Sequence, residues 1–254
     1  MKRLKSIGNN FTPITFFLLI LAGWQYIVDR GIIERYILPS PSDIIITGFR
    51  ILPELRPHIM TTLEEASTGF IIAILLAIIL AIFMDSFPLA KKAFYPLFII
   101  SQTIPIIVLV PLLVMWFGFD KLPKIIVVIL VCFFPIVVNL LEGLESVDKD
   151  MLNLFKSMKA NYFQIFKFAK FPASLGNFFS GLKIAATYSI MGAVIGEWMG
   201  GKDGLGVYMT RVRQSFALDK VFSVIVVIVL LSLALFKIIE FVQYLAMPWT
   251  RETK

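Results

Sequence analysis

Six stretches of this sequence are apolar over enough residues to cross a membrane as helices, and no other feature constrains the fold as strongly. A bilayer core about 30 Å thick needs about 20 mostly apolar residues in a helix. Charged residues are only 16% of the 254 residues, against about 25% in average proteins, and the apolar stretches are nearly free of them. We therefore predict an all-α, polytopic membrane protein, a single domain over 1–254 with six transmembrane helices. These lie at roughly 13–29, 62–84, 94–117, 124–141, 181–199 and 221–245.

The first apolar stretch follows the basic start Met1-Lys2-Arg3-Leu4-Lys5, as in a secretory signal. A cleaved signal needs small residues in an A-x-A-like arrangement after its apolar core. The sequence there is Val28-Asp29-Arg30-Gly31, which does not fit. We interpret the stretch as an uncleaved first membrane helix.

Charge and residue counts exclude several functions. The net charge of +7 is explained by Lys and Arg that flank membrane segments and face anionic lipid, and no nucleic-acid recognition fold or basic stripe accompanies it. The chain holds one cysteine, Cys132, and one histidine, His58. These are too few for a disulfide or a metal site built from Cys and His. We expect no nucleic-acid partner, no metal and no cofactor.

The second apolar stretch opens with Thr61-Thr62-Leu63-Glu64-Glu65, in which two Thr-x-x-Glu pairs resemble capping boxes. This pattern predicts that a helix begins here. Glu64 and Glu65 are either part of a transport site or an acidic first turn that the helix dipole stabilises, and the second interpretation is favoured.

The third stretch contains Pro96, Pro105 and Pro111, with Gln102 between them. Prolines in a membrane helix leave backbone groups that neighbours or water in a cavity must satisfy. This helix either lines the transport pathway, with Gln102 and Pro105 as candidate pathway residues, or is a kinked packing helix.

The fifth stretch has small residues on one face, among them Gly192 and Gly196. This spacing predicts a close helix–helix contact, either within the chain or between two copies. Glu197 follows at the end of the stretch. It is interpreted equally well as a pathway or gate residue and as an interfacial anchor beside Trp198.

Residues 148–170 predict an amphipathic helix outside the membrane core. Met151, Phe155, Met158 and Tyr162 recur at helical spacing, while lysines stand away from them. Such a helix suits either a lipid surface or a groove on a partner protein.

At this segment the sequence resembles the permeases of ABC importers, in the branch for nitrate, sulfonates, taurine and thiamine-precursor pyrimidines. That family has a cytoplasmic loop patterned Glu-Ala-Ala, three residues, Gly, nine residues, Ile-x-Leu-Pro. The frame falls here on Asn153-Leu154-Phe155, then Lys159, then Ala169-Lys170-Phe171-Pro172, so Lys159 and Pro172 keep the family's spacing while most of its residues are replaced. The resemblance implies a cytoplasmic coupling segment at about 142–172. Its ATPase-coupling residues are Asn153, Phe155, Met158, Lys159, Tyr162 and Pro172.

The resemblance extends over most of the chain through motifs in the family's order. They are Leu38-Pro39-Ser40-Pro41, Ser101-Gln102-Thr103-Ile104-Pro105, Trp116-Phe117-Gly118, Gly181-Leu182-Lys183, Gly196-Glu197-Trp198-Met199-Gly200-Gly201 and Gly204-Leu205-Gly206. The resemblance implies a type I permease fold in the bacterial cytoplasmic membrane with both termini in the cytoplasm. It also implies three protein partners: a separate ABC ATPase subunit, an extracytoplasmic solute-binding protein and a second permease copy.

The stretch 188–220 is similar to permeases for thiamine pyrimidine precursors such as hydroxymethylpyrimidine or formylaminopyrimidine. The shared segments are 192–198, 208–211 and 215–219. Permeation of a sulfonate, taurine, nitrate or riboflavin is the alternative within the same family.

Two other classes of function are weighed against a permease. A membrane-embedded enzyme would need converging acid and base groups, for which the sequence is poor. A passive channel is excluded by the resemblance alone. Gly196, Gly201 and Lys202 match the start of a phosphate-binding loop, but Asp203 replaces the Ser or Thr that binds magnesium, so we expect no nucleotide site.

Overall fold

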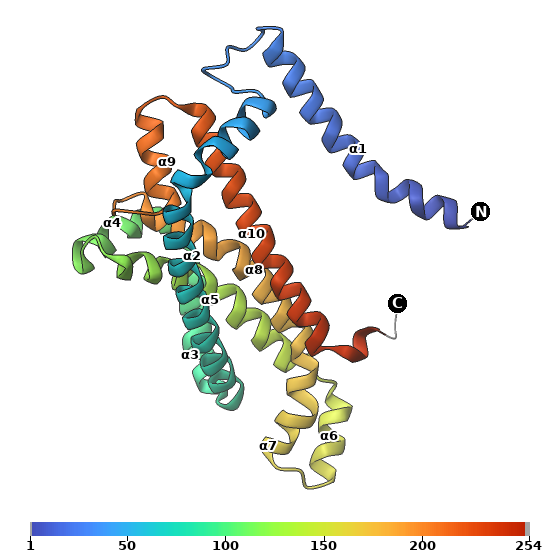
Figure 1. Cartoon of the computed structure of the whole chain (residues 1–254). Helices are drawn as coiled ribbons and strands as arrows, with labels where there is room; N and C mark the ends of the chain where they lie inside the picture. The colour runs from blue at the N-terminus through green and yellow to red at the C-terminus, as the bar shows by residue number, and fades with distance from the viewer. Residues whose placement is uncertain (1, 252–254) are drawn as a thin grey trace. The chain divides into compact units, whose positions relative to one another are not determined.

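The computed structural model describes the backbone of residues 2–251 and the side chains of residues 13–249, and this part of the chain is helical without strands. The all-α prediction is thereby confirmed. The α-helices are α1 Lys2–Asp29, α2 Pro41–Ser86, α3 Pro88–Thr103, α4 Ile106–Phe117, α5 Lys121–Glu145, α6 Lys149–Ser157, α7 Tyr162–Ile165, α8 Phe171–Glu197, α9 Leu205–Gln214 and α10 Leu218–Ala246 (Figure 1). A π-helical turn, η1 Phe166–Lys170, joins α7 to α8, and a 3₁₀ turn, η2 Pro248–Arg251, follows α10.

Four helical segments within the described residues are long and apolar enough to cross a membrane: Pro41–Ser86, Lys121–Glu145, Tyr162–Glu197 and Leu218–Ala246. Helices α3 and α4 are long and apolar enough to cross a membrane only when taken together, and they meet at 97°. If this pair counts as one span, the described residues contain up to five spans. The first apolar stretch supplies a shorter apolar helix, Pro13–Asp29. The polytopic membrane class is confirmed, and the count of six spans stays a prediction.

Helix α2 begins at Pro41, so the prediction that it starts at Thr61 is wrong. The side-chain hydroxyl of Ser40 accepts a hydrogen bond from the Asp43 N–H at 3.2 Å, and proline follows at the first helical position, where its missing N–H costs nothing. Thr61 lies in the helix interior, where its hydroxyl donates to the Pro57 carbonyl at 3.2 Å. The Thr-x-x-Glu pattern is therefore not a cap but part of a continuous helix.

The chain divides into two compact units. The first consists of Met1–Arg56 and Tyr208–Val227. Within it the first turns of α10 are tied to the first turns of α2: Ser223 Oγ donates to the Ile44 carbonyl at 2.7 Å, and Thr47 Oγ1 donates to Asp219 at 3.0 Å. These bonds fix the extracellular end of α2, in the predicted topology, to the segment that follows α9.

The second unit consists of Pro57–Val207 and Ile228–Lys254, and it contains the largest hydrophobic core of the described residues. Ala73, Ala77 and Ala81 form a fully buried stripe on α2, four residues apart. Cys132 on α5 and Ile190 on α8 are also completely buried in this core. Small residues bring helix backbones close together, which is how helices associate where lipid removes the hydrophobic driving force.

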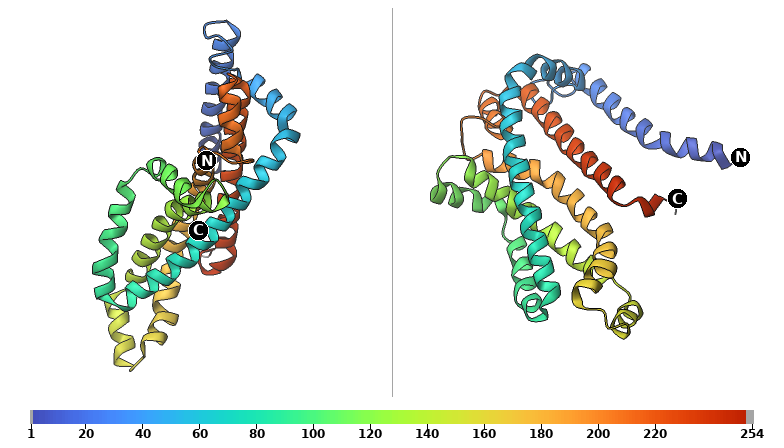
Figure 2. Two further views of the ribbon diagram at one scale, coloured as in Figure 1. Left: turned by 90° about the vertical axis from the view of Figure 1, so that its left-hand side faces the viewer. Right: turned by 60° about the horizontal axis from the view of Figure 1, so that its bottom comes forward.

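Helices α5 and α8 lie side by side in this unit and make the most extensive helix contact among the described residues (Figure 2). A Cβ on Gly192 would stand 2.8 Å from Val131, and one on Gly196 would stand 3.0 Å from the Lys124 backbone. Both distances are so short that a side chain at either position would require α5 to shift. The predicted seam of small residues is therefore a contact within the chain, between α8 and α5.

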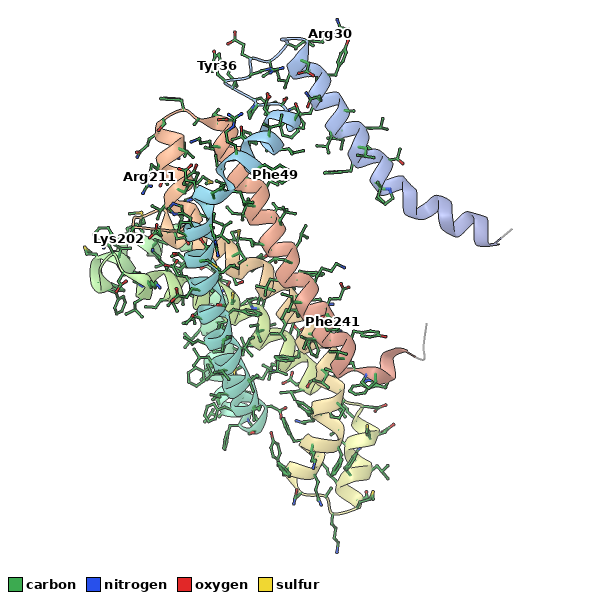
Figure 3. The ribbon with its side chains drawn as sticks, in the orientation of Figure 1. Arg30, Tyr36, Phe49, Lys202, Arg211 and Phe241 are labelled. Atoms are coloured by element: carbon green, nitrogen blue, oxygen red, sulfur yellow. The ribbon has the colours of Figure 1, made fainter. Side chains whose placement is uncertain are left out.

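Large apolar side chains point away from the long helices. Phe49 on α2 is 75% exposed and Phe241 on α10 is 62% exposed, and both extend from the ribbon in Figure 3. Soluble monomers rarely expose contiguous apolar patches above a few hundred Å². Such surfaces are typical of helices that face lipid or another membrane subunit.

Candidate functional site

The segment predicted as one helix over 148–170 is a helical hairpin, and the prediction of a continuous helix is wrong. Helix α6 ends at Ser157 and α7 begins at Tyr162, and the two lie side by side in Figures 1 and 2. Lys159 in the turn has a φ of 57°, the left-handed region that glycine favours. It stands where the family pattern has its Gly, so this chain keeps the left-handed turn with a lysine.

Hydrogen bonds show how this turn is closed. The Ala160 N–H donates to the Phe155 carbonyl at 3.0 Å and the Lys159 N–H donates to the Lys156 carbonyl at 2.9 Å. These two bonds are the Schellman pattern that ends many helices. On the far side of the turn, Asn161 and Gln164 form a reciprocal capping box. The four residues between Ser157 and Tyr162 thus end one helix and begin the next.

A buried carboxylate holds the hairpin against the end of α2. The side chain of Asp85 is 3% exposed, accepts a hydrogen bond from the Tyr162 hydroxyl at 2.9 Å and pairs with Lys170 Nζ at 2.6 Å. The Tyr162 hydroxyl also lies 2.7 Å from Ser86 Oγ. We call Asp85, Ser86, Tyr162 and Lys170 the hairpin clamp. Of these four, only Tyr162 was predicted as a functional residue.

The outer face of the hairpin is apolar and uncovered. Met151 is 43% exposed, Leu154 60% and Met158 72%, and they recur at helical spacing on α6. Phe155 is half-buried, and Asn153 is exposed. Phe155 lies four residues from Met151, so it belongs to the predicted apolar face, which the more exposed Leu154 widens.

The sixth predicted coupling residue, Pro172, lies in the first turn of α8. The helical segment is continuous from Tyr162 to Glu197, so Pro172 leaves a carbonyl of the preceding turn without its N–H donor, beside the π-helical turn Phe166–Lys170. It is exposed, as is the neighbouring Phe171.

A second set of residues forms a buried charged cluster in the same unit. Glu65 on α2 is fully buried and lies 3.2 Å from Lys124 Nζ on α5, whose side chain is 5% exposed. The Glu65 carboxyl group also interacts with that of Glu197 at the end of α8. We call Thr62, Glu65, Lys124 and Glu197 the buried cluster, and it joins three helices of this unit.

Glu197 is fully buried, and both of its carboxylate oxygens are hydrogen-bonded. The Thr62 hydroxyl donates to Oε1 at 2.7 Å, and the Gly206 N–H donates to Oε2 at 2.6 Å. The Leu205 N–H donates to the Thr62 hydroxyl oxygen at 2.9 Å. Glu197 thereby holds the loop between α8 and α9 against α2. Its part in a transport pathway stays a prediction.

Glycines let this loop pass close to the carboxylate. Gly204 has a φ of 133° and its N–H donates to His58 Nδ1 at 3.0 Å. A Cβ on Gly204 would overlap the Glu197 carboxyl group, and one on Gly206 would overlap the Val194 carbonyl. Gly204 and Gly206 are thus required by the close approach of the backbone to Glu197 and Val194. Among the described residues no group of His, Cys, Asp and Glu could hold a metal ion.

The predicted pathway residues Gln102 and Pro105 lie at the break between α3 and α4. Ile104 is extended at φ −83° and ψ 117°, as the residue before a proline prefers, and Pro105 precedes the first turn of α4. A small pocket of about 130 Å³ opens here. It is lined by Ser101, Gln102, Ile104, Ile106, Leu109, Leu130, Val131 and Phe133.

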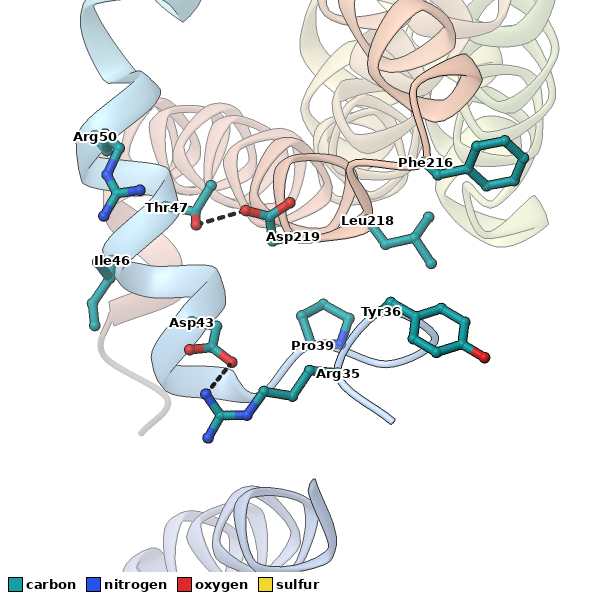
Figure 4. Close-up of a pocket in the computed structure, with 10 residues that line it drawn as sticks. All are labelled: Arg35, Tyr36, Pro39, Asp43, Ile46, Thr47, Arg50, Phe216, Leu218 and Asp219. Atoms are coloured by element: carbon teal, nitrogen blue, oxygen red, sulfur yellow. Dashed lines mark hydrogen bonds and ion pairs between the residues drawn. The ribbon is translucent and has the colours of Figure 1, made fainter. Parts of the chain in front are cut away.

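A larger pocket of about 440 Å³ lies in the first unit (Figure 4). Arg35 and Arg50 line it together with Tyr36 and Phe216. Phe216 is 85% exposed and has a φ of 56°, which is rare for a bulky residue and marks local strain. In Figure 4, Arg35 reaches Asp43 at 3.7 Å and Thr47 reaches Asp219. The sequence did not single out this pocket.

Tyr208 anchors α9 in the same unit. Burial and the neighbouring Glu54 carboxylate raise the pKa of Tyr208 to about 12. The phenol therefore stays protonated at physiological pH.

Comparison with known proteins identifies relatives along nearly the whole chain. Residues 73–252 match the family described as binding-protein-dependent transport system inner membrane component. The chain is 36% identical over 241 residues to the formylaminopyrimidine transport permease protein ThiX of Halalkalibacterium halodurans, covering 94% of this chain and 96% of the relative. It is 28% identical to the riboflavin transport system permease protein RibX of Chloroflexus aurantiacus, covering 93% and 89%, and 28% identical to the putative aliphatic sulfonates transport permease protein SsuC of Bacillus subtilis, covering 82% and 76%.

Proposed function

The chain belongs to the family of binding-protein-dependent transport system inner membrane components, and we propose that it carries a thiamine pyrimidine precursor into the bacterial cell. It is the membrane-spanning permease subunit of an ABC importer, a multi-pass protein of the inner membrane without catalytic residues of its own. The similarity of 36% over 94% of the chain to a formylaminopyrimidine permease is the observation that carries the proposed substrate.

We propose that the hairpin α6–α7 is the element on which a separate ATPase subunit acts. The exposed apolar side chains Leu154 and Met158 fit a groove on a partner protein, because a few buried anchors dominate the energy of such contacts. Lys159 shapes the turn between the two helices, and Asn153 and Pro172 flank the surface. Phe155, four residues from Met151 on α6, would add to the same apolar surface.

The hairpin clamp supports a route by which this contact would move the membrane helices. Tyr162 and Lys170 both hold Asp85, which lies in the last turn of α2. Glu65 stands 20 residues earlier on the same helix, about 30 Å away along its axis. A displacement of the hairpin would therefore be passed through α2 to the buried cluster, where α2 meets α5 and the end of α8.

An extracytoplasmic solute-binding protein would deliver the solute, as the family name implies. If residues 148–170 are cytoplasmic, the chain path places the segments 30–40 and 215–217 on the outside. The pocket that these segments line presents Arg35 and Arg50 beside Asp43 and Asp219, together with the exposed ring of Phe216. We propose that a loop of the binding protein docks there.

A second permease copy and lipid would cover the exposed apolar surface. Phe49, Phe241 and their exposed neighbours account for part of it. With residues 148–170 inside, both termini lie in the cytoplasm. A sulfonate, taurine, nitrate or riboflavin is the alternative solute, which the relatives named for sulfonates and riboflavin support.

Gene deletion tests the proposed substrate. In a strain that requires an exogenous thiamine pyrimidine precursor, deletion should abolish growth on limiting formylaminopyrimidine, and a plasmid copy should restore it. Unchanged growth, with loss of sulfonate or riboflavin uptake instead, would reject the pyrimidine.

A further inference from the structure

The break between α3 and α4 exposes irregular backbone where a membrane protein ordinarily cannot. Residues 99–105 are all exposed, and the two helices meet at 97°. Lys92 marks one boundary of the apolar segment, and the break at Ile104 is 12 residues beyond it, about 18 Å of helix rise. This is within a hydrocarbon core about 30 Å thick.

Lipid does not tolerate such a break. Pro105 has no N–H, so the carbonyl of Ser101 cannot form its usual bond four residues along. The first N–H groups of α4 have no partner within their helix, and no side chain caps them. Irregular backbone at membrane depth occurs only where protein covers it or where it lines a water-filled cavity. The break is therefore covered by protein or lines a cavity, and a pocket of about 130 Å³ opens at it.

This pocket is mainly apolar and uncharged, with Ser101 and Gln102 as its polar side chains. The sequence has no Asp, Glu, Lys, Arg or His at 93–119 or at 125–141, which include all eight lining residues. Gln102 offers an amide that both donates and accepts, and its side chain is exposed, with one long bond of 3.5 Å to Ser101. Backbone carbonyl and N–H groups add further acceptors and donors. Phe133 and Leu130 supply apolar surface for a flat ring.

We propose that this pocket is the solute-contacting constriction of the transport pathway, and that it passes uncharged, single-ring nitrogen heterocycles with an amino group beside a ring nitrogen. The inference rests on the proposed function and names the place where the chain touches its solute. Such a ring presents a donor and an acceptor on one edge, which Gln102 and the broken backbone complement, while Phe133 contacts its face.

The same features disfavour the alternative solutes. A sulfonate or nitrate would enter without any cation to pair with, and an unpaired charge in a low-dielectric site is costly. Riboflavin has three fused rings and a ribityl chain. The volume of this pocket, about 130 Å³, is well below the roughly 300–1,000 Å³ of sites that hold drug-sized ligands.

Uptake by the reconstituted complex tests the constriction. The permease and its ATPase are reconstituted in vesicles with ATP on the side of the ATPase and the binding protein on the other side. Uptake of labelled formylaminopyrimidine is then measured. Gln102→Leu should lower uptake roughly 5- to 10-fold, because a desolvated polar solute loses its partner. Ile107→Ala, an exposed α4 residue outside the pocket, should stay within twofold of the wild type. Wild-type uptake by the Gln102→Leu variant would overturn the inference.

Thiol labelling provides a readout that needs no transport. In a Gln102→Cys variant, a small water-soluble thiol reagent should react, and formylaminopyrimidine presented with the binding protein should slow the reaction. The wild-type chain is the blank, because its one cysteine, Cys132, is buried. If the wild type fails to import the pyrimidine but position 102 is labelled, the proposed substrate is wrong and the aqueous constriction stands. An unreactive thiol at position 102 would overturn the constriction itself, whatever solute is transported.

Discussion

Glu65 and Lys124 form a 3.2 Å ion pair between α2 and α5, and neither side chain has more than 5% of its surface exposed. One turn away, the same two helices carry a second pair, Glu64 with Lys121 at 2.7 Å, whose side chains are 60% and 47% exposed. The chain therefore contains a buried ion pair and an exposed one between the same two helices, and they offer a matched comparison.

Removing one partner of the buried pair should be far more damaging than removing one partner of the exposed pair. Lys124→Ala leaves the buried Glu65 carboxylate without its partner, which lowers the free energy of unfolding by about 3–5 kcal/mol. Lys121→Ala should cost about 1 kcal/mol or less, because water already solvates that pair. Thermal unfolding of the detergent-purified permease measures both. Replacing both partners, Glu65→Leu with Lys124→Met, should recover much of the loss. Equal effects of Lys124→Ala and Lys121→Ala would show that the buried pair does not join the helices.

The loop after α8 should tolerate no side chain at Gly206. A Cβ there would overlap the Val194 carbonyl and stand 2.9 Å from the Glu197 Cβ, so backbone must move and the bond to Glu197 is lost. We expect Gly206→Ala to lower the unfolding temperature clearly. Gly176→Ala on α8 is the control, since its nearest neighbour is 4.0 Å away and alanine favours the helix. A Gly206→Ala protein as stable as the control would contradict this close approach of the loop to α8.

The hairpin turn should become more stable when Lys159 is replaced by glycine. A left-handed residue with a Cβ costs roughly 1 kcal/mol, so Lys159→Gly should gain about that amount and Lys159→Val should lose more. Hydrogen exchange of the Lys159 and Ala160 amides, which close the turn, reports the change locally. Lys156→Gly, one turn earlier in α6, should have the opposite sign. Faster exchange in Lys159→Gly would argue against the Schellman turn.

Truncation of the outer hairpin face should uncouple the ATPase while leaving the permease intact. Leu154→Ala with Met158→Ala removes two exposed anchors, and loss of such anchors typically costs about 2 kcal/mol or more of binding. We expect normal permease abundance in the membrane, but loss of ATPase on co-purification. Lys156→Ala, also exposed on α6, should retain the ATPase. Full ATPase retention by the double variant would mean that the hairpin rests on lipid.

The orientation of the hairpin can be tested in intact cells. A cysteine at Lys156 should resist an impermeant thiol reagent added outside, whereas one at Lys121, at the start of α5, should react. Both positions are exposed, so burial does not explain a difference between them. Labelling of position 156 from outside would reverse the proposed topology.

Long apolar runs predicted the helices because length and hydropathy are local properties. The prolines predicted a single helix over 94–117 that is kinked or lines the pathway, but not the break at Ile104, where the following proline restricts the backbone. Local sequence patterns gave a wrong prediction where the same residues fit both a helix start and a helix interior. Thr61 and Glu64 resembled a helix start, yet Ser40 and Pro41 provide it.

Pairings between distant residues could not be predicted. Glu65 and Lys124 each looked like surface charges beside an apolar stretch, and only the packing of α2 on α5 brings them together. Nothing in the local sequence around Asp85 indicates that it holds Tyr162 and Lys170. The stop at Ser157 was likewise missed, because the left-handed residue that follows it is a lysine and not a glycine.

ATP-dependent uptake tests the central claim most directly. Vesicles containing the permease and its ATPase, with the binding protein outside and ATP inside, should accumulate labelled formylaminopyrimidine against its gradient. Omitting ATP, the ATPase or the binding protein should each abolish accumulation, and Leu154→Ala with Met158→Ala should do the same. Equal entry with no ATP or ATPase would identify a passive channel, and chemical conversion of the pyrimidine by the permease alone would identify an enzyme. Either result would contradict ATP-driven import through this permease.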